Sequence, residues 1–373
     1  MGKLVGKIVL TGGPCAGKTT ALARIEQDLS EKGYHVFVVG ESATELIKGG
    51  IRPFGANPFD LVSFQKLILK YQYEKEQIYE EAIRMLPEGE KGVILHDRGL
   101  MDNKAYIPDD VFHQMVVENN MQELDLLDSY DMVLHLVTAA DGCPEYYTLE
   151  NNQARTETVD EAITLDKNTQ AAWLGHSRLV IIDNSTDFDN KINRALENIY
   201  QLLHPNYSIR YQKKYVIDLN DSVYKFLNKV GANAIDIEQT YLQSDQDNYE
   251  RRLRKRTLNG ENTYYLTVQK KKDEGLSKIV TDKKITEKEY LKLLEYPVIG
   301  SVTKKRYTFI YKKQYFKLDI IDDSLALLEV NPISSKSKIN LPDKLTVIKE
   351  VTDDTDYDNA TLAKKHSKQY VNK

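Results

Sequence analysis

Short apolar runs alternate with helical patterns over the first 205 residues of the chain. Strands of a parallel sheet are buried on both faces, so they read as continuous apolar runs between amphipathic helices. The pattern therefore predicts a parallel sheet covered by helices, with the carboxyl ends of its strands, where ligands bind, along one edge. The expected strands are Lys7–Leu10, His35–Val39, Gly92–Leu95, Met132–Val137 and Leu179–Ile182, and the longest expected helix runs from about Phe59 to Met85.

The sequence pattern changes after His204-Pro205-Asn206, where Tyr-rich segments with alternating charge begin. Many period-two segments and few helices predict an antiparallel sheet or barrel. The capping-box sequence Thr286-Glu287-Lys288-Glu289 predicts one helix, ending near Leu294. We therefore expect domains at residues 1–205 and 206–363, and a frayed polar tail over residues 364–373. The expected strands of the second domain are Arg210–Ile217, Ile235–Leu242, Tyr249–Thr257, Thr263–Lys271, Thr303–Tyr311, Tyr315–Asp322 and Ala326–Val330.

Charge is distributed unevenly between these halves. The chain has 51 Lys and Arg against 56 Asp and Glu, and residues 206–373 hold 32 of the basic and 24 of the acidic residues. Residues 1–205 are therefore strongly acidic and the rest is basic. A basic domain favours an anionic ligand, although an ordinary solvated lysine-rich surface produces the same bias.

Cysteine usage and hydropathy indicate a reducing, cytoplasmic setting. Cys15 and Cys143 are the only cysteines of the chain, which leaves no disulfide framework beyond one pair. No run of apolar residues is long enough for a membrane span, and the first strand begins too early for a signal peptide. The oligomeric state is left open.

The segment Gly12-Gly13-Pro14-Cys15-Ala16-Gly17-Lys18-Thr19 fits the phosphate-binding loop pattern G-x-x-x-x-G-K-[ST]. It lies between an expected strand and an expected helix, which is the context that the motif requires. Backbone N–H groups of such a loop face phosphate oxygens, and the helix N-terminus adds a positive dipole end. Lys18 is expected to reach the β- and γ-phosphates, and Thr19 to hold Mg²⁺. The predicted nucleotide-binding residues of the loop are Gly12, Gly13, Ala16, Gly17, Lys18, Thr19 and Thr20.

Acidic residues at two strand ends supply the rest of the predicted phosphoryl chemistry. Asp97 follows an apolar run, where an acid that orients the metal would lie, and Arg98 beside it could contact phosphate. Glu41 ends the second expected strand and could accept a proton from a substrate hydroxyl. Both acids have structural alternatives, because Asp97 could cap the next turn and Glu41 could cap the helix that follows it.

Two further residues complete the candidate nucleotide site. Arg155, in a loop, could close over the phosphates and exclude water, although its charge alone also suits a surface arginine. Asn184 follows a strand end near the expected position of the nucleotide base. The chain contains no Asn-Lys-x-Asp motif, so ATP and GTP both remain possible ligands.

Several blocks together resemble the AAA_28 type of P-loop domain, a group similar to ribosylnicotinamide kinases and deoxynucleoside kinases. In combination with the second domain, the chain resembles the TRPL-translocation-defect family of GTP-binding proteins, which join such a domain to a CYTH-like domain. The resemblance implies nucleoside-triphosphate binding with Mg²⁺, a metal role for Asp97 and a lid role for Arg155. The blocks are Gly12–Thr20, Glu41–Glu45, His96–Asp102, Arg155 with Glu157, Leu165-Asp166, Trp173–His176 and Ile182–Phe188.

The resemblance to CYTH domains implies a second domain built as an antiparallel barrel, with basic side chains that bind a triphosphate in a tunnel and paired glutamates that hold metal. Strand alternation would place Arg252, Arg254 and Arg256 on one face. The chain departs from the family pattern at its acids: Glu329 is present, but Asn331 stands where a second acid is expected. The candidate anion-binding residues are Lys214, Arg252, Arg254, Arg256, Lys270, Lys304 and Arg306.

Three functions are compatible with these observations. The first is a Mg²⁺-dependent NTPase or small-molecule kinase whose basic barrel binds a phosphorylated small molecule. The second is a non-catalytic nucleotide switch whose barrel meets a phosphoinositide, a phosphoprotein or an RNA end. The third is a CYTH triphosphatase that uses Asp236, Glu238 and Glu329 as metal ligands.

Overall fold

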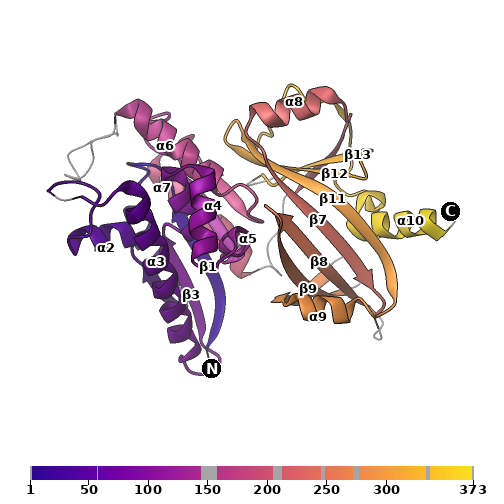
Figure 1. The fold of residues 1–373 in the computed structure, drawn as a ribbon, viewed down its shortest axis with the longest axis horizontal. Helices are drawn as coiled ribbons and strands as arrows, with labels where there is room; N and C mark the ends of the chain where they lie inside the picture. The colour runs from indigo at the N-terminus through magenta and orange to yellow at the C-terminus, as the bar shows by residue number, and fades with distance from the viewer. Residues whose placement is uncertain are drawn as a thin grey trace. The chain divides into compact units, whose positions relative to one another are not determined.

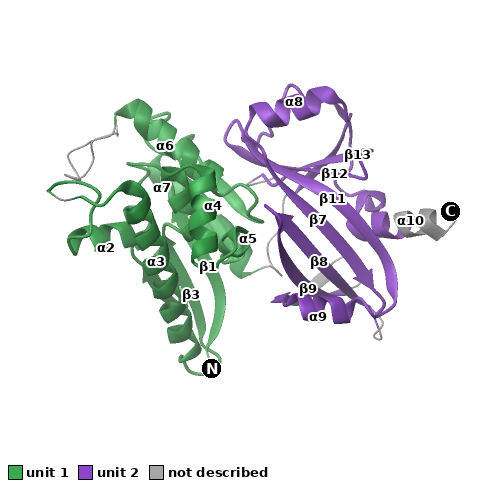
Figure 2. Ribbon diagram, viewed as in Figure 1, with its two compact units in different colours: residues 1–209 green, residues 210–373 purple. Residues whose placement is uncertain are grey.

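A computed structural model gives the structure of the chain. It describes residues 2–56, 58–143, 158–204, 212–244, 248–271, 277–332 and 337–371. The chain divides into two compact units, Met1–Ile209 and Arg210–Lys373, which are coloured separately in Figure 2.

The first unit is built on a five-stranded sheet of order β2-β3-β1-β4-β5, in which all neighbouring strands are parallel. The strand that leads into the phosphate loop, β1, is therefore central. The strands are β1 (Lys3–Thr11), β2 (His35–Val39), β3 (Lys91–Asp97), β4 (Met132–Leu136) and β5 (Leu179–Ile182). The helices are α1 (Lys18–Glu31), α2 (Ser42–Lys48), α3 (Leu61–Arg84), η1 (Leu100–Tyr106), α4 (Asp109–Glu118), α5 (Glu123–Asp128), α6 (Val159–Ala172) and α7 (Phe188–Leu203) (Figure 1).

Helices cover both faces of this sheet. Lys7 on β1 forms an ion pair with Glu80 of α3, whereas a Cβ on the preceding Gly6 would contact Leu203 of α7. Successive strand residues point to opposite faces, so α3 and α7 lie on opposite sides of the sheet. Helix starts follow local chemistry: the side chains of Asp60, at α3, and Asp187, at α7, accept hydrogen bonds from backbone N–H groups of the first turn.

The second unit is a nine-stranded antiparallel sheet of order β10-β9-β8-β7-β11-β12-β13-β6-β14. In this order β10 and β14 are the edge strands. The strands are β6 (Lys213–Ile217), β7 (Asn233–Leu242), β8 (Tyr249–Leu258), β9 (Glu261–Lys271), β10 (Ser277–Ile285), β11 (Val298–Tyr311), β12 (Gln314–Ile321), β13 (Leu325–Val330) and β14 (Val347–Glu350). The helices are α8 (Asp221–Lys229), α9 (Glu287–Leu293), η4 (Thr355–Tyr357) and α10 (Asn359–Val371).

The two faces of the sheet differ in chemistry. One face is apolar and is covered by α8, through Phe226, and by α9, through Tyr290. The other face carries Arg252, Arg254 and Arg256, and we call it the basic face. Part of the basic face is covered by α10, whose Leu362 and Ala363 join a buried cluster with sheet residues Tyr241, Val302 and Leu327.

The predicted fold class, a parallel α/β domain followed by an antiparallel β domain, is confirmed. The expected helix near residue 286 is present, with Thr286 and Glu289 in a capping box. The structure extends α10 to Val371, whereas the sequence suggests a frayed polar tail from residue 364. Packing explains this difference: Ala363 is fully buried against the sheet, and its carbonyl would lie 2.5 Å from a Cβ at Gly300. None of the described helices is both long and apolar enough to cross a bilayer.

Candidate functional site

The phosphate loop joins β1 to α1 in the first unit. Gly12 and Gly17 have φ values of 144° and 82°, a region that side chains rarely adopt, and a Cβ at Gly17 would lie 2.5 Å from the Phe188 ring. The first N–H groups of α1 lack partners within the helix, so the amides of Lys18, Thr19 and Thr20 open toward an anion. Thr19 and Thr20 are exposed.

Gly13 departs from its predicted role as a phosphate donor. Its backbone N–H donates to Asp166 Oδ1 at 2.8 Å, so this amide is committed to a carboxylate behind the loop. Pro14 has no N–H to offer. The cradle is thus restricted to the later residues of the loop and the start of α1.

Lys18 folds back over the loop. Its Nζ donates to the carbonyl oxygens of Gly12 at 3.0 Å and Gly13 at 3.2 Å. Burial lowers the pKa of Lys18 to about 8, and the positive charge of Arg98 adds to this effect. The acids Asp97 and Glu41 also act on the Lys18 charge, which places all four predicted side chains at the same edge of the sheet.

Glu41 and Arg98 form an ion pair at this edge. Arg98 Nε donates to Glu41 Oε1 at 2.7 Å, and the Thr44 hydroxyl donates to Glu41 Oε2 at 2.5 Å. Glu41 occupies the N-cap position of α2, but its side chain makes no capping hydrogen bond. Burial alone would raise the pKa of Glu41, but Arg98 and Thr44 outweigh it and hold the pKa at about 2.

Asp97 is the last residue of β3, and its geometry suits a cation. Its Oδ1 is buried and makes no hydrogen bond within the described part of the chain. The next turn is capped instead by Asp102, whose Oδ2 accepts from the Gly99 N–H at 2.7 Å. Burial raises the pKa of Asp97, and the nearby charge of Lys18 offsets this effect only in part. An unpartnered carboxylate oxygen is the kind of oxygen ligand that Mg²⁺ prefers.

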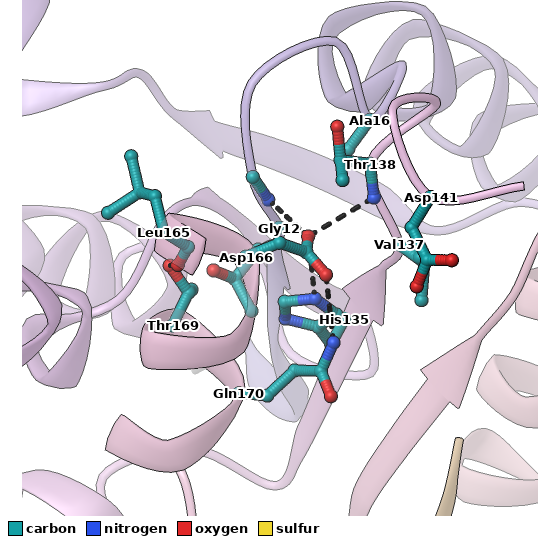
Figure 3. A network of polar contacts seen from close by, with 12 residues as sticks. Gly12, Ala16, His135, Val137, Thr138, Asp141, Leu165, Asp166, Thr169 and Gln170 are labelled. Carbon is teal, nitrogen blue, oxygen red and sulfur yellow. Dashed lines mark hydrogen bonds and ion pairs between the residues drawn. The ribbon is translucent and has the colours of Figure 1, made fainter. Parts of the chain in front are cut away.

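A network behind the loop, shown in Figure 3, was not predicted from sequence. Asp166 of α6 is buried, and its Oδ1 accepts from the N–H groups of Gly13 and Thr138 and lies 3.1 Å from His135 Nε2. Its Oδ2 accepts from Gln170 at 2.8 Å. Burial opposes ionisation, but His135 and these donors lower the pKa of Asp166 overall. The carboxylate therefore connects the loop to β4 and α6.

Asn184 lies in this supporting structure rather than in an open position. Its Nδ2 donates to the carbonyl oxygens of Thr138 and Asp141, at 2.8 Å and 2.9 Å, and its Oδ1 accepts from Lys191 at 2.7 Å. These bonds engage both ends of the amide, so base recognition by this side chain would require them to break. Lys191 also donates to Val137 O, and burial lowers its pKa to about 8.

Arg155, the predicted lid residue, lies outside the described residues. The described part of the chain contains no cluster of three or more metal-binding side chains, so a metal in the first unit would depend on Asp97, Thr19 and phosphate oxygens.

On the second unit, strand register brings six of the seven predicted cations together. Arg252, Arg254 and Arg256 pair with Tyr241, Gln239 and Ile237 of β7, and the same register continues across the sheet. Lys270 is the exception: it pairs with Tyr249, and its Nζ lies over the Tyr249 ring on the opposite face. The six residues on the basic face are Lys214, Arg252, Arg254, Arg256, Lys304 and Arg306.

Asp319 on β12 neutralises part of the basic face and was missed in the sequence. Lys304 Nζ donates to its Oδ2 at 2.6 Å, and Arg306 holds it with two bonds of 2.6 Å and 2.7 Å. Burial acts against the charge of Asp319, but Arg306 and Lys304 depress its pKa far below the ordinary range. Lys214 lies 3.6 Å from Glu329 and 3.8 Å from Asp358.

The carboxylates proposed for a triphosphatase do not converge. Asp236 and Glu238 pair with Lys305 and Thr303 of β11, which places them on the apolar side of the sheet. Glu329 lies on the basic face, opposite Lys214 of β6. Asp319, rather than either β7 acid, shares that face with Glu329.

Comparisons with known proteins agree with the geometry of the first unit. Residues 7–191 match the model of the family AAA_28, described as an AAA domain. This region is similar to AAA domains of the P-loop type. The broader resemblance to the TRPL-translocation-defect family stays a prediction. No curated protein matches the chain.

Two solved structures illustrate what the chain is similar to. One is the inorganic triphosphatase NE1496, at 22% identity over 42% of this chain and 95% of that chain, with a TM-score of 0.32. The other is the PH1819 protein from Pyrococcus horikoshii OT3, at 19% identity over 36% of this chain and 81% of that chain, with a TM-score of 0.26.

Proposed function

We propose that the AAA domain binds a Mg²⁺–nucleoside triphosphate and catalyses transfer of its terminal phosphoryl group to water or to a small hydroxyl compound. The observation that supports this most strongly is the convergence of Lys18, Asp97, Glu41 and Arg98 at one sheet edge, beside the phosphate loop. Phosphoryl transfer depends mainly on positioning and charge neutralisation, which these residues are suited to provide.

Each residue has a distinct role in this proposal. Lys18 would leave the carbonyl oxygens of the loop and contact the β- and γ-phosphates, regaining its full charge. Arg98 would contact the transferring group. Glu41 stays ionised at every physiological pH, so it would accept a hydrogen bond from the attacking hydroxyl and orient it rather than act as a strong base.

Thr19 and Asp97 would hold Mg²⁺, through a hydroxyl and a carboxylate oxygen. When bound, the ion neutralises negative charge on the phosphates. Arg155 is a candidate lid that would exclude water from the site.

A turnover assay tests this proposal. Phosphate release and phosphorylated product are measured with ATP and GTP, with and without a panel of nucleosides and sugars, for wild type, Lys18→Ala and Glu41→Gln. Turnover stimulated by an acceptor and lost in Glu41→Gln supports a kinase. Turnover independent of acceptor, but still lost in Lys18→Ala, supports an NTPase. Nucleotide binding without any turnover supports the non-catalytic switch instead. Absence of nucleotide binding refutes the kinase, the NTPase and the switch.

We further propose that the basic face of the second unit binds a phosphorylated ligand. Its support is the register that gathers six cations on one face of the sheet. Arg254 and Tyr265 add a stacked cation and aromatic ring, at 4.9 Å, on the same face. Guanidinium groups recognise phosphate oxygens through paired hydrogen bonds, which suits arginine at three alternate positions of one strand.

Inorganic tripolyphosphate is a suitable probe for this face. Calorimetric titration of the full chain is compared for wild type, Arg254→Gln and Arg251→Gln. Arg251 lies on the same strand but faces the other side, where it packs over Tyr296 at 5.0 Å. We expect Arg254→Gln to weaken binding and Arg251→Gln to leave it unchanged. Equal effects of the two substitutions would indicate nonspecific charge attraction.

A further inference from the structure

The turn that carries the candidate catalytic Arg98 has an unfavourable backbone conformation. Arg98 has φ 71°, in the left-handed region that residues other than glycine rarely adopt. Such a conformation persists only where surrounding contacts hold it in place. Beside it, Gly99 lies so close to Trp173 that a Cβ would come within 2.6 Å of the indole ring.

Two side chains hold the backbone of this turn from behind. Gln72 of α3 donates through Nε2 to the Arg98 carbonyl oxygen at 3.1 Å. The Tyr130 hydroxyl accepts from the Leu100 N–H at 2.9 Å. Both side chains are buried, so neither bond has water as a ready substitute.

Both side chains are oriented by the same carboxylate oxygen. Glu76 Oε1 accepts from Gln72 Nε2 at 3.0 Å and from the Tyr130 hydroxyl at 2.8 Å. Glu76 is 1% exposed, and His96 and Lys7 lie 3.4 Å and 3.9 Å from its oxygens. A buried carboxylate is costly unless it is paired and hydrogen-bonded. Its presence here is explained if it directs two donors to fixed positions.

We propose that Glu76 is a positioning residue, which through Gln72 and Tyr130 fixes the left-handed turn that aims Arg98 at Glu41 and the phosphate site. The proposal rests on the phosphoryl-transfer function proposed above, since it gives Arg98 its task. Among the described residues, Glu76 forms no hydrogen bond or ion pair with Arg98 or with the phosphate loop. Its effect is therefore indirect.

Three substitutions separate this role from simple stabilisation. Gln72→Met keeps the length of the side chain but removes the donor to Arg98. Tyr130→Phe removes the hydroxyl that links Glu76 to Leu100. The matched control is Tyr34→Phe, which also removes the hydroxyl of a buried tyrosine, one that lies 3.0 Å from His204 Nε2.

The first readout is steady-state turnover together with nucleotide affinity for the full chain. Because small misplacements of a catalytic group are costly, we expect Gln72→Met and Tyr130→Phe each to lower kcat roughly 10- to 100-fold. Nucleotide Kd should stay within about twofold, because the phosphate loop is untouched. Tyr34→Phe should change neither quantity. An unchanged kcat in Gln72→Met, or an equal loss in Tyr34→Phe, would overturn the proposal.

The second readout does not depend on activity. Trp173 is the only tryptophan of the chain, and it packs against Gly99 and, at a ring-centroid distance of 5.5 Å, Tyr130. Its emission therefore reports on the turn. Gln72→Met should shift the Trp173 emission of the folded protein, and an identical spectrum would count against the proposal even if wild type proves to lack turnover. Lack of turnover in wild type, with the shift present, would overturn only the proposed function.

Discussion

Nucleotide binding should be coupled to proton uptake by Lys18. In the ligand-free structure burial lowers the pKa of Lys18 to about 8, from an ordinary value of 10.5. At pH 8 about half of the molecules therefore carry an uncharged amine. A bound triphosphate places several negative charges beside this group, which favours its protonated form. Binding at pH 8 should then take up about half a proton per molecule, whereas binding at pH 6 should take up almost none through this group.

The structure also sets the size of the pH effect on affinity. Full recovery of the ordinary pKa corresponds to a shift of 2.5 units, worth at most about 3 kcal/mol. The sign follows from the direction of the shift. Below pH 8 the Lys18 amine is already charged, so it adds no pH dependence to the affinity. Above pH 8 a growing share of the molecules must first gain a proton. Affinity should fall about tenfold per pH unit above 8, until the pKa of the bound state is reached.

Isothermal titration calorimetry in buffers of different ionisation enthalpy measures this uptake directly. The matched variant is Lys18→Arg, because a guanidinium stays protonated over the whole range and can still contact phosphate. We expect a buffer-dependent enthalpy at pH 8 for wild type and none for Lys18→Arg. If wild type shows no buffer dependence, or if both proteins show the same dependence, Lys18 does not approach the phosphates from its buried position.

Three other predictions concern metal binding and stability. Asp97→Asn should make triphosphate affinity, measured by calorimetry, the same in Mg²⁺ as in a chelator. It should not lower the melting temperature in a thermal melt, because burial already disfavours the charged carboxylate. Asp319→Asn should lower the free energy of unfolding by about 3–5 kcal/mol, measured in urea, because Lys304 would stay buried, and Arg306 half-buried, without their anion. Since the Asp319 pKa is depressed in the fold, the stability it contributes is present above the unfolded pKa near 4 and is lost as pH falls below it. Asp60→Ala should lower the melting temperature slightly through loss of the α3 cap, and nucleotide Kd should not change.

Local sequence signals predicted the parts of the first unit that depend on neighbouring residues. The phosphate loop is contiguous, and Asp97 and Glu41 follow strands whose apolar runs are unmistakable. Contacts between distant residues left no such signal. Asp166 binds Gly13 across 153 positions of the chain, and Glu76 binds Tyr130 across 54. In a single sequence, a buried acid on a helix looks the same as an exposed one.

In the second unit, too, the sequence predicted what depends on a single strand and missed what depends on how strands pair. Alternation alone placed Arg252, Arg254 and Arg256 on one face, because they lie on one strand. It could not place Lys270, whose face depends on how β9 pairs with β8. Asp319 lies on β12, and its ionised form is stabilised by Lys304 and Arg306, which lie on the neighbouring strand β11.

Both cationic sites of this chain already contain an acid that satisfies them. Glu41 holds Arg98 in the first unit, and Asp319 holds Lys304 and Arg306 in the second. An incoming ligand has to compete with these internal counter-ions. Chloride or acetate, with one charge each, gains too little to displace a carboxylate that is fixed in place, whereas a multiply charged phosphate chain gains much more. If both sites bind phosphates as proposed, these internal acids would favour polyvalent anions over the abundant small ones.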